Sequence, residues 1–161
     1  MPKTITRSGR QRTALAAAPG LVADVLSDPA AVTEMLGDLL DQQRSQVGPP
    51  STWVIPRIRL GLASFDTILV PSFRRTDDQV RITAVTTPTS QAEARLVMDL
   101  SPTPVGPAAC HLETVWKLQL GVPVPRTALR LAGPALDRAV ASTVQRIMRR
   151  TEAAVLAAVP E

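Results

Sequence analysis

The last thirty or so residues carry the pattern that most restricts how this chain can fold. From Thr127 to about Ala158, apolar and small side chains recur at steps of three and four, the spacing of one helix face. That stripe comprises Leu129, Ala132, Leu136, Val140, Thr143, Ile147, Thr151, Ala154 and Ala158. A long helix with one apolar side must bury that side, so the preceding residues have to supply a surface that covers it.

Two residues interrupt the helical pattern near its start. Gly133 and Pro134 lie inside the predicted helix, and an interior proline removes a backbone donor and crowds the preceding turn. We expect a kink there, or a split into two helices, which would open one end of a cavity.

The segments before this helix have the period of strands. Apolar and polar residues alternate in five stretches separated by turn residues, which predicts an antiparallel sheet with one buried and one wet face. The expected strands are 52–62, 64–74, 79–86, 91–100 and 110–120, with a hairpin turn at 76–78 and another turn at 102–107. The last strand is the clearest, because Cys110, Leu112, Thr114, Trp116, Leu118 and Leu120 share one face.

The N-terminal part predicts one more strand and two short helices. A strand is expected over 10–18, preceded by a flexible basic arm over 1–9. Pro19 suits the first turn of one helix, and Asp28 with Pro29 suits the cap and first turn of a second helix that runs to about Leu40. The fold class is therefore α+β: an antiparallel sheet curved around a long C-terminal helix, with two short helices after the first strand. A chain of 161 residues is expected to form one domain, 1–161.

This order of elements resembles the helix-grip fold of the START-like (SRPBCC) superfamily, and its bacterial members in particular. The polyketide cyclase/dehydrase group, the Bet v 1 allergens and one of the subunits of carbon monoxide dehydrogenase belong to it. Three stretches carry the resemblance: "AAAPGLVADVLSDPAAVTEML", "CHLETVWKLQL" and "ALDRAVASTVQRIMRRTEAAVLAAV". The first is the most specific, because Pro19, Ser27, Asp28 and Pro29 match the family's entry motif. The resemblance implies a cavity for hydrophobic molecules between sheet and helix. It implies no catalytic residues, because the superfamily has no shared catalytic constellation.

The first functional hypothesis is a non-catalytic protein that binds or transports a hydrophobic small molecule or lipid. Binding sites of this kind are mostly apolar, with few polar anchors. The residues expected to line the cavity are Ile82, Leu96, Met98, Leu112, Thr114, Trp116, Val140, Val144 and Ile147. Alternatively, these same side chains pack against one another as an ordinary hydrophobic core and leave no room for a ligand.

Two other functions stay open. One is an enzyme similar to the cyclases and dehydrases, in which Thr114, Asp66 or an ordered water positions a reactive intermediate. The other is a membrane-surface module similar to the carbon monoxide dehydrogenase member of the superfamily, in which Arg138, Arg146, Arg149 and Arg150 meet anionic lipid. Alternatively, these arginines simply lie on the solvent-exposed face of the helix. The net charge of +4 nevertheless favours anionic partners.

Catalytic, metal and cofactor sites are not expected. His111 is the single histidine and falls on the wet face of its strand, while Cys110, the single cysteine, falls on the apolar face. With four aromatic residues in the chain, stacking on nucleic-acid bases is not expected either. One cysteine and no long apolar run favour a cytoplasmic location.

Overall fold

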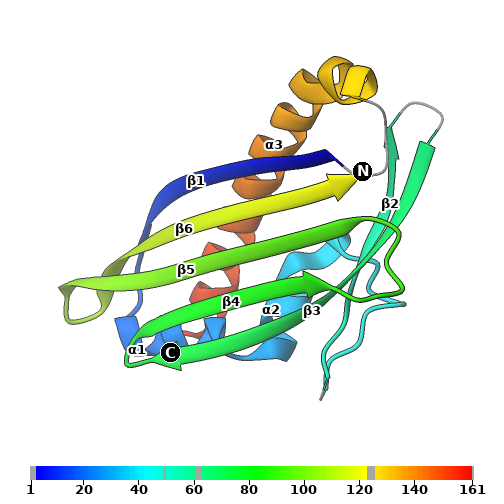
Figure 1. Ribbon diagram of the computed structural model, residues 1–161. Coiled ribbons are helices and arrows are strands. Elements are labelled where there is room, and N and C mark those ends of the chain that lie inside the picture. The colour runs from blue at the N-terminus through cyan, green and yellow to red at the C-terminus, as the bar shows by residue number, and fades with distance from the viewer. Residues whose placement is uncertain (1–2, 49, 61–62, 123–125, 161) are drawn as a thin grey trace.

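One antiparallel sheet forms the body of the molecule, and the C-terminal helix crosses one of its faces (Figure 1). The computed structural model describes residues 3–48, 50–60, 63–122 and 126–160. The strands are β1 Lys3–Leu15, β2 Trp53–Leu60, β3 Ala63–Thr76, β4 Gln79–Thr86, β5 Glu93–Gly106 and β6 Ala109–Val122. The helices are α1 Pro19–Leu26, α2 Pro29–Leu36 and α3 Arg126–Ala158, and a 3-10 turn, η1 Gly37–Leu39, follows α2.

The strand order is β1-β6-β5-β4-β3-β2, and every neighbouring pair is antiparallel. The first strand therefore pairs with the last one, from Lys3 opposite Val122 to Leu15 opposite Cys110. We call the face that carries the core residues the inner face. The helix-grip arrangement expected from the sequence is confirmed.

Two prolines and one carboxylate determine where the two short helices begin. Pro19 and Pro29 each occupy the first turn of a helix, where the missing N–H costs nothing. Asp28 caps α2 as expected, because its side chain accepts a hydrogen bond from the Ala30 backbone N–H at 3.1 Å. The second helix is shorter than expected: it ends at Leu36 because Gly37 adopts a positive φ of 53°.

The first strand is longer than the sequence pattern indicated. Residues 3–9 were expected to form a flexible basic arm, yet β1 starts at Lys3 and residues 3–9 pair with β6. Ile5 is the one apolar side chain among 3–9, so the alternation that marks a half-buried strand is weak there. The partner strand, which lies more than a hundred residues away in the sequence, supplies the hydrogen bonds.

The expected turn over 102–107 is also corrected. Strand β5 continues through Pro102 and Pro104 to Gly106, opposite Leu112, Cys110 and Ala109 of β6. Its pairing with β4 extends only as far as Leu100. Beyond that point β5 forms an edge of the sheet as described, where a proline removes no ladder hydrogen bond.

Helix α3 is a single helix with Pro134 inside it, so the expected split does not occur. The expected bend does occur: the first turns of α3, yellow in Figure 1, run at an angle to the rest of the helix. The core lies between the inner face and the three helices. Its fully enclosed side chains include Val22, Leu26, Val32, Trp53, Val80, Ile82, Leu112 and Val155.

Candidate ligand-binding site between the sheet and helix α3

The strand register aligns inner-face side chains into rows that cross the sheet. One row passes through the middle of the candidate cavity and contains, from β1 to β3, Gly9, Trp116, Met98, Ile82 and Phe73. Three of these five residues, Ile82, Met98 and Trp116, were expected from the sequence to line the cavity. Leu96 on β5 and Leu112 and Thr114 on β6 lie in neighbouring rows of the same face.

Two contacts place helix α3 against this face. The Arg7 Nε of β1 lies 2.5 Å from Asp137 Oδ1, and Thr13 Oγ1 of β1 lies 3.6 Å from the Met148 sulfur. Arg7 pairs with Leu118 and Thr13 with Leu112. The N-terminal half of α3 therefore lies over the Leu118 end of β6, and the middle of α3 lies over the Leu112 end.

Burial differs between these two ends. At the closed end, Leu112 and Thr114 on β6, Leu100 on β5, and Thr151 and Val155 on α3 are all buried. At the other, open end, Leu96, Trp116 and Leu118 of the inner face and Val140 and Val144 of α3 are half-buried, as is Ile147 next to Met148, whereas Ala94 and Leu120 in the row beyond Leu118 are buried. These half-buried apolar side chains on the sheet and on α3 are less completely packed than those of the closed end.

The nine expected cavity residues therefore fall into two groups. Ile82, Met98, Leu112 and Thr114 belong to the buried inner face. Leu96, Trp116, Val140, Val144 and Ile147 are half-buried, and Leu96, Trp116 and Ile147 also pack against the core. The strand register brings the six strand residues among them to the inner face, and α3, which carries the other three, lies on the same side of the sheet.

Polar atoms without partners accompany these apolar side chains. Thr114 Oγ1, Trp116 Nε1 and Thr67 Oγ1 are enclosed and have no hydrogen-bond partner among the described residues. All three residues belong to the inner face. Because an unpaired buried polar group typically costs about 1–3 kcal/mol, this face could bond a polar atom that the chain itself does not supply.

Trp53 is a residue of this region that sequence reasoning did not single out. Its indole is fully buried and its Nε1 donates to Thr33 Oγ1 at 3.0 Å. Its ring meets Phe73 edge to face, with the ring centroids 6.1 Å apart. The sequence did place Trp53 in an expected strand. Its hydrogen bond with Thr33 of α2 depends on how the helix packs against the sheet, which the local pattern does not report.

The C-terminal half of α3 is held by Arg150, which the sequence analysis assigned to a lipid-facing surface. Arg150 Nη1 donates to the Leu36 carbonyl oxygen at 2.6 Å, and Nη2 lies 2.5 Å from Asp38 Oδ1. The same arginine lowers the pKa of Asp38 by hydrogen bonding and by its charge. Arg150 is therefore a tie between α3 and the turn after α2. Arg138, Arg146 and Arg149 are exposed.

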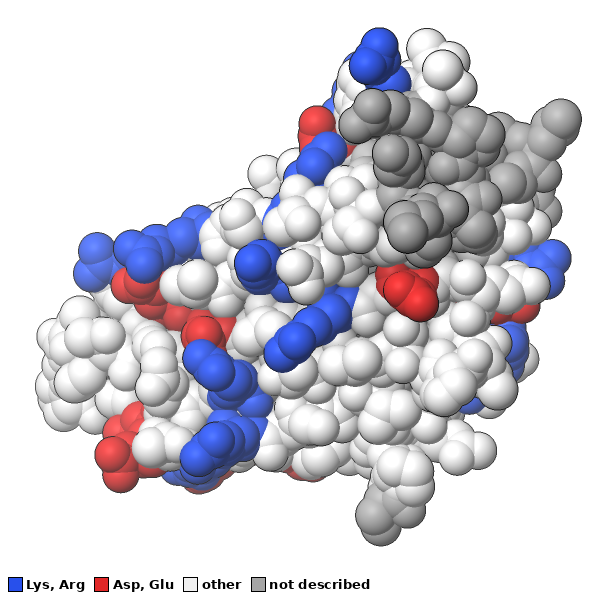
Figure 2. Space-filling model, viewed as in Figure 1, with Lys and Arg blue, Asp and Glu red and all other residues white. Residues whose placement is uncertain are grey.

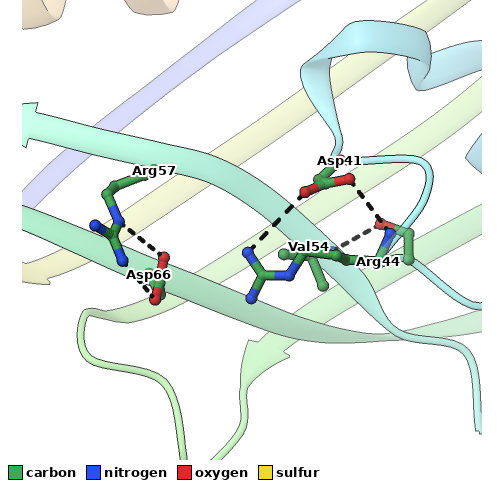
Figure 3. Close-up of polar contacts among 6 residues, drawn as sticks. Asp41, Arg44, Val54, Arg57 and Asp66 are labelled. Atoms are coloured by element: carbon green, nitrogen blue, oxygen red, sulfur yellow. Dashed lines mark hydrogen bonds and ion pairs between the residues drawn. The ribbon is translucent and has the colours of Figure 1, made fainter.

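Asp66, named as a candidate for positioning a reactive intermediate, does not reach the inner face. Its neighbours in β3, Phe65 and Thr67, are buried, and the Asp66 carboxylate pairs instead with Arg57 of β2 at 3.3 Å (Figure 3). The hydrogen bond from Arg57 lowers the pKa of Asp66. A separate group of polar contacts lies beside this pair (Figure 3): Asp41 pairs with Arg44, its backbone N–H donates to the Val54 carbonyl oxygen, and the Val54 N–H donates to Ser45 Oγ.

The single cysteine and histidine lie on opposite faces of β6. Cys110 is fully buried, and loss of hydration raises the pKa of its thiol, which disfavours the nucleophilic thiolate. His111 is half-buried, and its Nδ1 has no partner among the described residues. Within the described ranges, no group of three or more His, Cys, Asp or Glu side chains could hold a metal ion.

The outer face of the sheet carries mixed charges rather than a single basic field (Figure 2). Arg10 pairs with Glu113 at 3.1 Å and Arg81 with Asp99 at 2.7 Å. Two surface hollows, of about 580 and 260 Å³, include Arg95 and Arg81 among their lining residues, and neither is lined by any of the nine expected cavity residues.

Comparisons with known proteins support the fold. No protein-family model and no curated protein sequence matches the chain. Solved structures do match. A Thermus thermophilus protein superimposes with a TM-score of 0.63 at 15% identity, over 96% of this chain and 100% of its own. A START superfamily protein from Mycobacterium smegmatis gives 0.58 at 14% identity, over 94% and 99% of the two chains.

A third match is the Zhui aromatase/cyclase from Streptomyces, with a TM-score of 0.59 at 11% identity, over 95% of this chain and 93% of that one. Identities this low establish a shared fold. In the part of the chain that the structure describes, no helix is both long and apolar enough to cross a bilayer. The element order, the sheet topology and these matches together show that this chain has the helix-grip fold of the START-like superfamily.

Proposed function

We propose that this chain binds a hydrophobic small molecule or lipid between the sheet and helix α3, without catalysis. The observation that carries the proposal is the set of half-buried apolar side chains on the sheet and on α3, above all Leu96, Trp116 and Ile147. Burial of apolar ligand surface there contributes about 25 cal/mol per Å². A cytoplasmic location goes with this proposal.

Native mass spectrometry of the purified protein beside its denatured spectrum tests the proposal. A bound mass of lipid or metabolite size that disappears on denaturation is the expected result. A clean mass of the chain alone, with no uptake from an added lipid extract, would contradict it.

A matched pair of variants localises the site. Val144 is half-buried at the open end, whereas its neighbour Gln145 is exposed. Val144→Phe should fill the space and abolish uptake, and Gln145→Phe should leave uptake unchanged. Equal uptake by both variants would move the binding site elsewhere.

The enzymatic alternative draws on the structural matches, which include the Zhui aromatase/cyclase and a norcoclaurine synthase from Thalictrum flavum. Among the two residues considered for it, Thr114 belongs to the inner face and Asp66 does not. Turnover of a polyketide substrate that Thr114→Val abolishes, with binding retained, would favour this alternative.

The membrane-surface alternative rests on the three exposed arginines of α3, Arg138, Arg146 and Arg149. Each surface cation contributes roughly 1 kcal/mol near anionic lipid. Under this alternative, the chain sediments with phosphatidylserine vesicles at low salt, and replacing all three arginines with Gln abolishes it. Sedimentation that is indifferent to salt and to these substitutions would rule it out.

A further inference from the structure

The polar atoms of the inner face carry an inference about the class of ligand. It rests on the function proposed above, because it concerns the same cavity. The central observation is Trp116, whose side chain is half-buried at the open end while its Nε1 is enclosed without a partner among the described residues. An indole N–H can only donate, so it requires an acceptor.

Gly9 holds the indole in this place. A Cβ atom built on Gly9 would lie only 2.7–2.9 Å from Cζ2, Cε2 and Nε1 of Trp116. The indole therefore lies over the backbone of β1, where any other residue would displace it. The two tryptophans also differ in their hydrogen bonding. Trp53 Nε1 donates to Thr33, whereas Trp116 Nε1 has no acceptor among the described residues.

Thr114 adds a second polar atom on the same face. It lies two residues before Trp116 on β6, which is roughly 7 Å along a strand. Its side chain is 1% exposed, and its hydroxyl has no partner among the described residues. Gln11 of β1 lies directly opposite Thr114 and is half-buried. A strip of polar groups therefore runs through an otherwise apolar surface.

The charges around this strip indicate a neutral ligand group. The cation nearest to it in the strand register is Arg7, two residues from Gly9 on the inner side of β1. Its guanidinium already lies 2.5 Å from Asp137 and donates to the Thr6 carbonyl oxygen. A carboxylate entering here would have to compete with Asp137, whereas a neutral carbonyl needs only the N–H of Trp116.

We infer that the ligand is an apolar molecule with a neutral carbonyl oxygen, as in a ketone or ester, and that this oxygen accepts a hydrogen bond from Trp116 Nε1. The Trp116 side chain is half-buried while its Nε1 is enclosed, so the ring has to turn away from the Gly9 backbone for its N–H to reach the ligand. The Thr114 hydroxyl serves a second oxygen or a water bound with the ligand.

The test uses NMR of the ¹⁵N-labelled protein, which has two indole N–H signals, one from each tryptophan. Trp116→Phe assigns them, and the Trp53 signal is an internal control. The probes are ethylbenzene, acetophenone and benzoate, which have similar size and differ in carrying no oxygen, a neutral carbonyl or a carboxylate.

The expected result is a downfield shift of the Trp116 indole proton with acetophenone and not with ethylbenzene, while the Trp53 signal stays in place. Trp116→Phe should weaken acetophenone binding roughly two- to tenfold, the effect of one net hydrogen bond. The same variant should leave ethylbenzene binding unchanged. Thr114→Val should have a smaller effect in the same direction.

Three outcomes would overturn the inference and leave the proposed function standing. In the first, acetophenone and ethylbenzene perturb the inner-face residues alike and the Trp116 proton does not respond. In the second, benzoate binds best and Arg7→Ala removes that preference. In the third, the Trp116 proton contacts a bound water that acetophenone does not displace. If none of the probes perturbs the inner-face resonances and the native mass is clean, the proposed function fails as well.

Discussion

At the scale of single residues, the contact between Gly9 and Trp116 shows how one missing Cβ shapes the inner face. Strand glycines usually weaken a sheet, because they supply no side chain to pack. At position 9 the indole of the neighbouring strand occupies the space that a side chain would need. The absence of a side chain at Gly9 therefore allows the Trp116 ring to lie against β1.

Gly9→Ala should destabilise the protein by about 1–3 kcal/mol, since the added methyl overlaps the indole ring. It should also shift the fluorescence emission of Trp116. Gly121 of β6 is the control, because a Cβ there would meet Glu93 at an ordinary 3.5 Å. Urea unfolding followed by circular dichroism measures both variants. Equal stabilities would show that the ring has room to move away.

The hydrogen bond between Thr33 and Trp53 makes a second prediction. Thr33→Val keeps the shape of the side chain but leaves the fully buried Trp53 Nε1 without an acceptor. We expect a loss of about 1–3 kcal/mol in the free energy of unfolding. Thr33→Ser retains the hydroxyl and should lose less. If Val costs no more than Ser, the hydrogen bond contributes no more than the packing of the single methyl group that Ser lacks.

At the scale of elements, helix α3 has two parts with different tasks. Thr151 and Val155 are buried and Arg150 is bonded to the turn after α2, whereas Val140 and Val144 are half-buried. Local opening has a lower free-energy cost where fewer apolar contacts are broken. We therefore expect the C-terminal part to anchor the helix and the N-terminal part to open more readily.

Hydrogen exchange should resolve these two parts. Amides near Val140 and Val144 should exchange faster than those near Thr151 and Val155, and a bound ligand should slow the former group selectively. Uniform protection along α3, with or without ligand, would contradict this division.

The tie made by Arg150 predicts a pH effect. The pKa of Asp38 is lowered in the folded chain, so this pair stabilises the fold above the unfolded-state pKa of about 3.9 and stops doing so as the pH falls through the folded value. Arg150→Ala should lower the melting temperature at pH 7. The difference from wild type should shrink below pH 4, leaving the part due to the Leu36 carbonyl.

Arg149 is the matched control for this tie, because it is the neighbouring residue and is exposed. Arg149→Ala should change stability by no more than about 0.5 kcal/mol. If the two alanine variants melt alike at pH 7, Arg150 does not hold the helix.

At the scale of the whole molecule, the sheet joins the first strand of the chain to the last one. Pairing of β1 with β6 joins residues 3–15 to residues 110–122, and α3 follows directly from β6. A ligand between the sheet and α3 would bind the folded chain and not the unfolded chain. Its binding energy therefore adds to the stability of the whole fold.

Acetophenone at a hundred times its dissociation constant should raise the free energy of unfolding by about 2.7 kcal/mol. Thermal unfolding at several ligand concentrations measures this, and Val144→Phe, with the cavity filled, should show no rise. An equal rise in both proteins would indicate binding outside the cavity.

The sequence alone was sufficient for the features that depend on short-range periodicity. The alternation in 79–86 and 110–120, the helical stripe of α3, the Asp28 cap and the inner-face assignment of Trp116 and Ile82 all follow from residues a few positions apart. These patterns, with the entry motif around Pro19 and Pro29, were enough to predict the helix-grip fold.

Only the tertiary structure decided what depends on distant partners. The pairing of residues 3–9 with β6, the passage of β5 through Pro102 and Pro104, and the use of Arg150 as a tie each need a neighbour far away in sequence. The same holds for the difference in burial between the closed and open ends of the inner face. Periodicity reports which face of an element is apolar, whereas burial and hydrogen bonding depend on which other element comes to lie against that face.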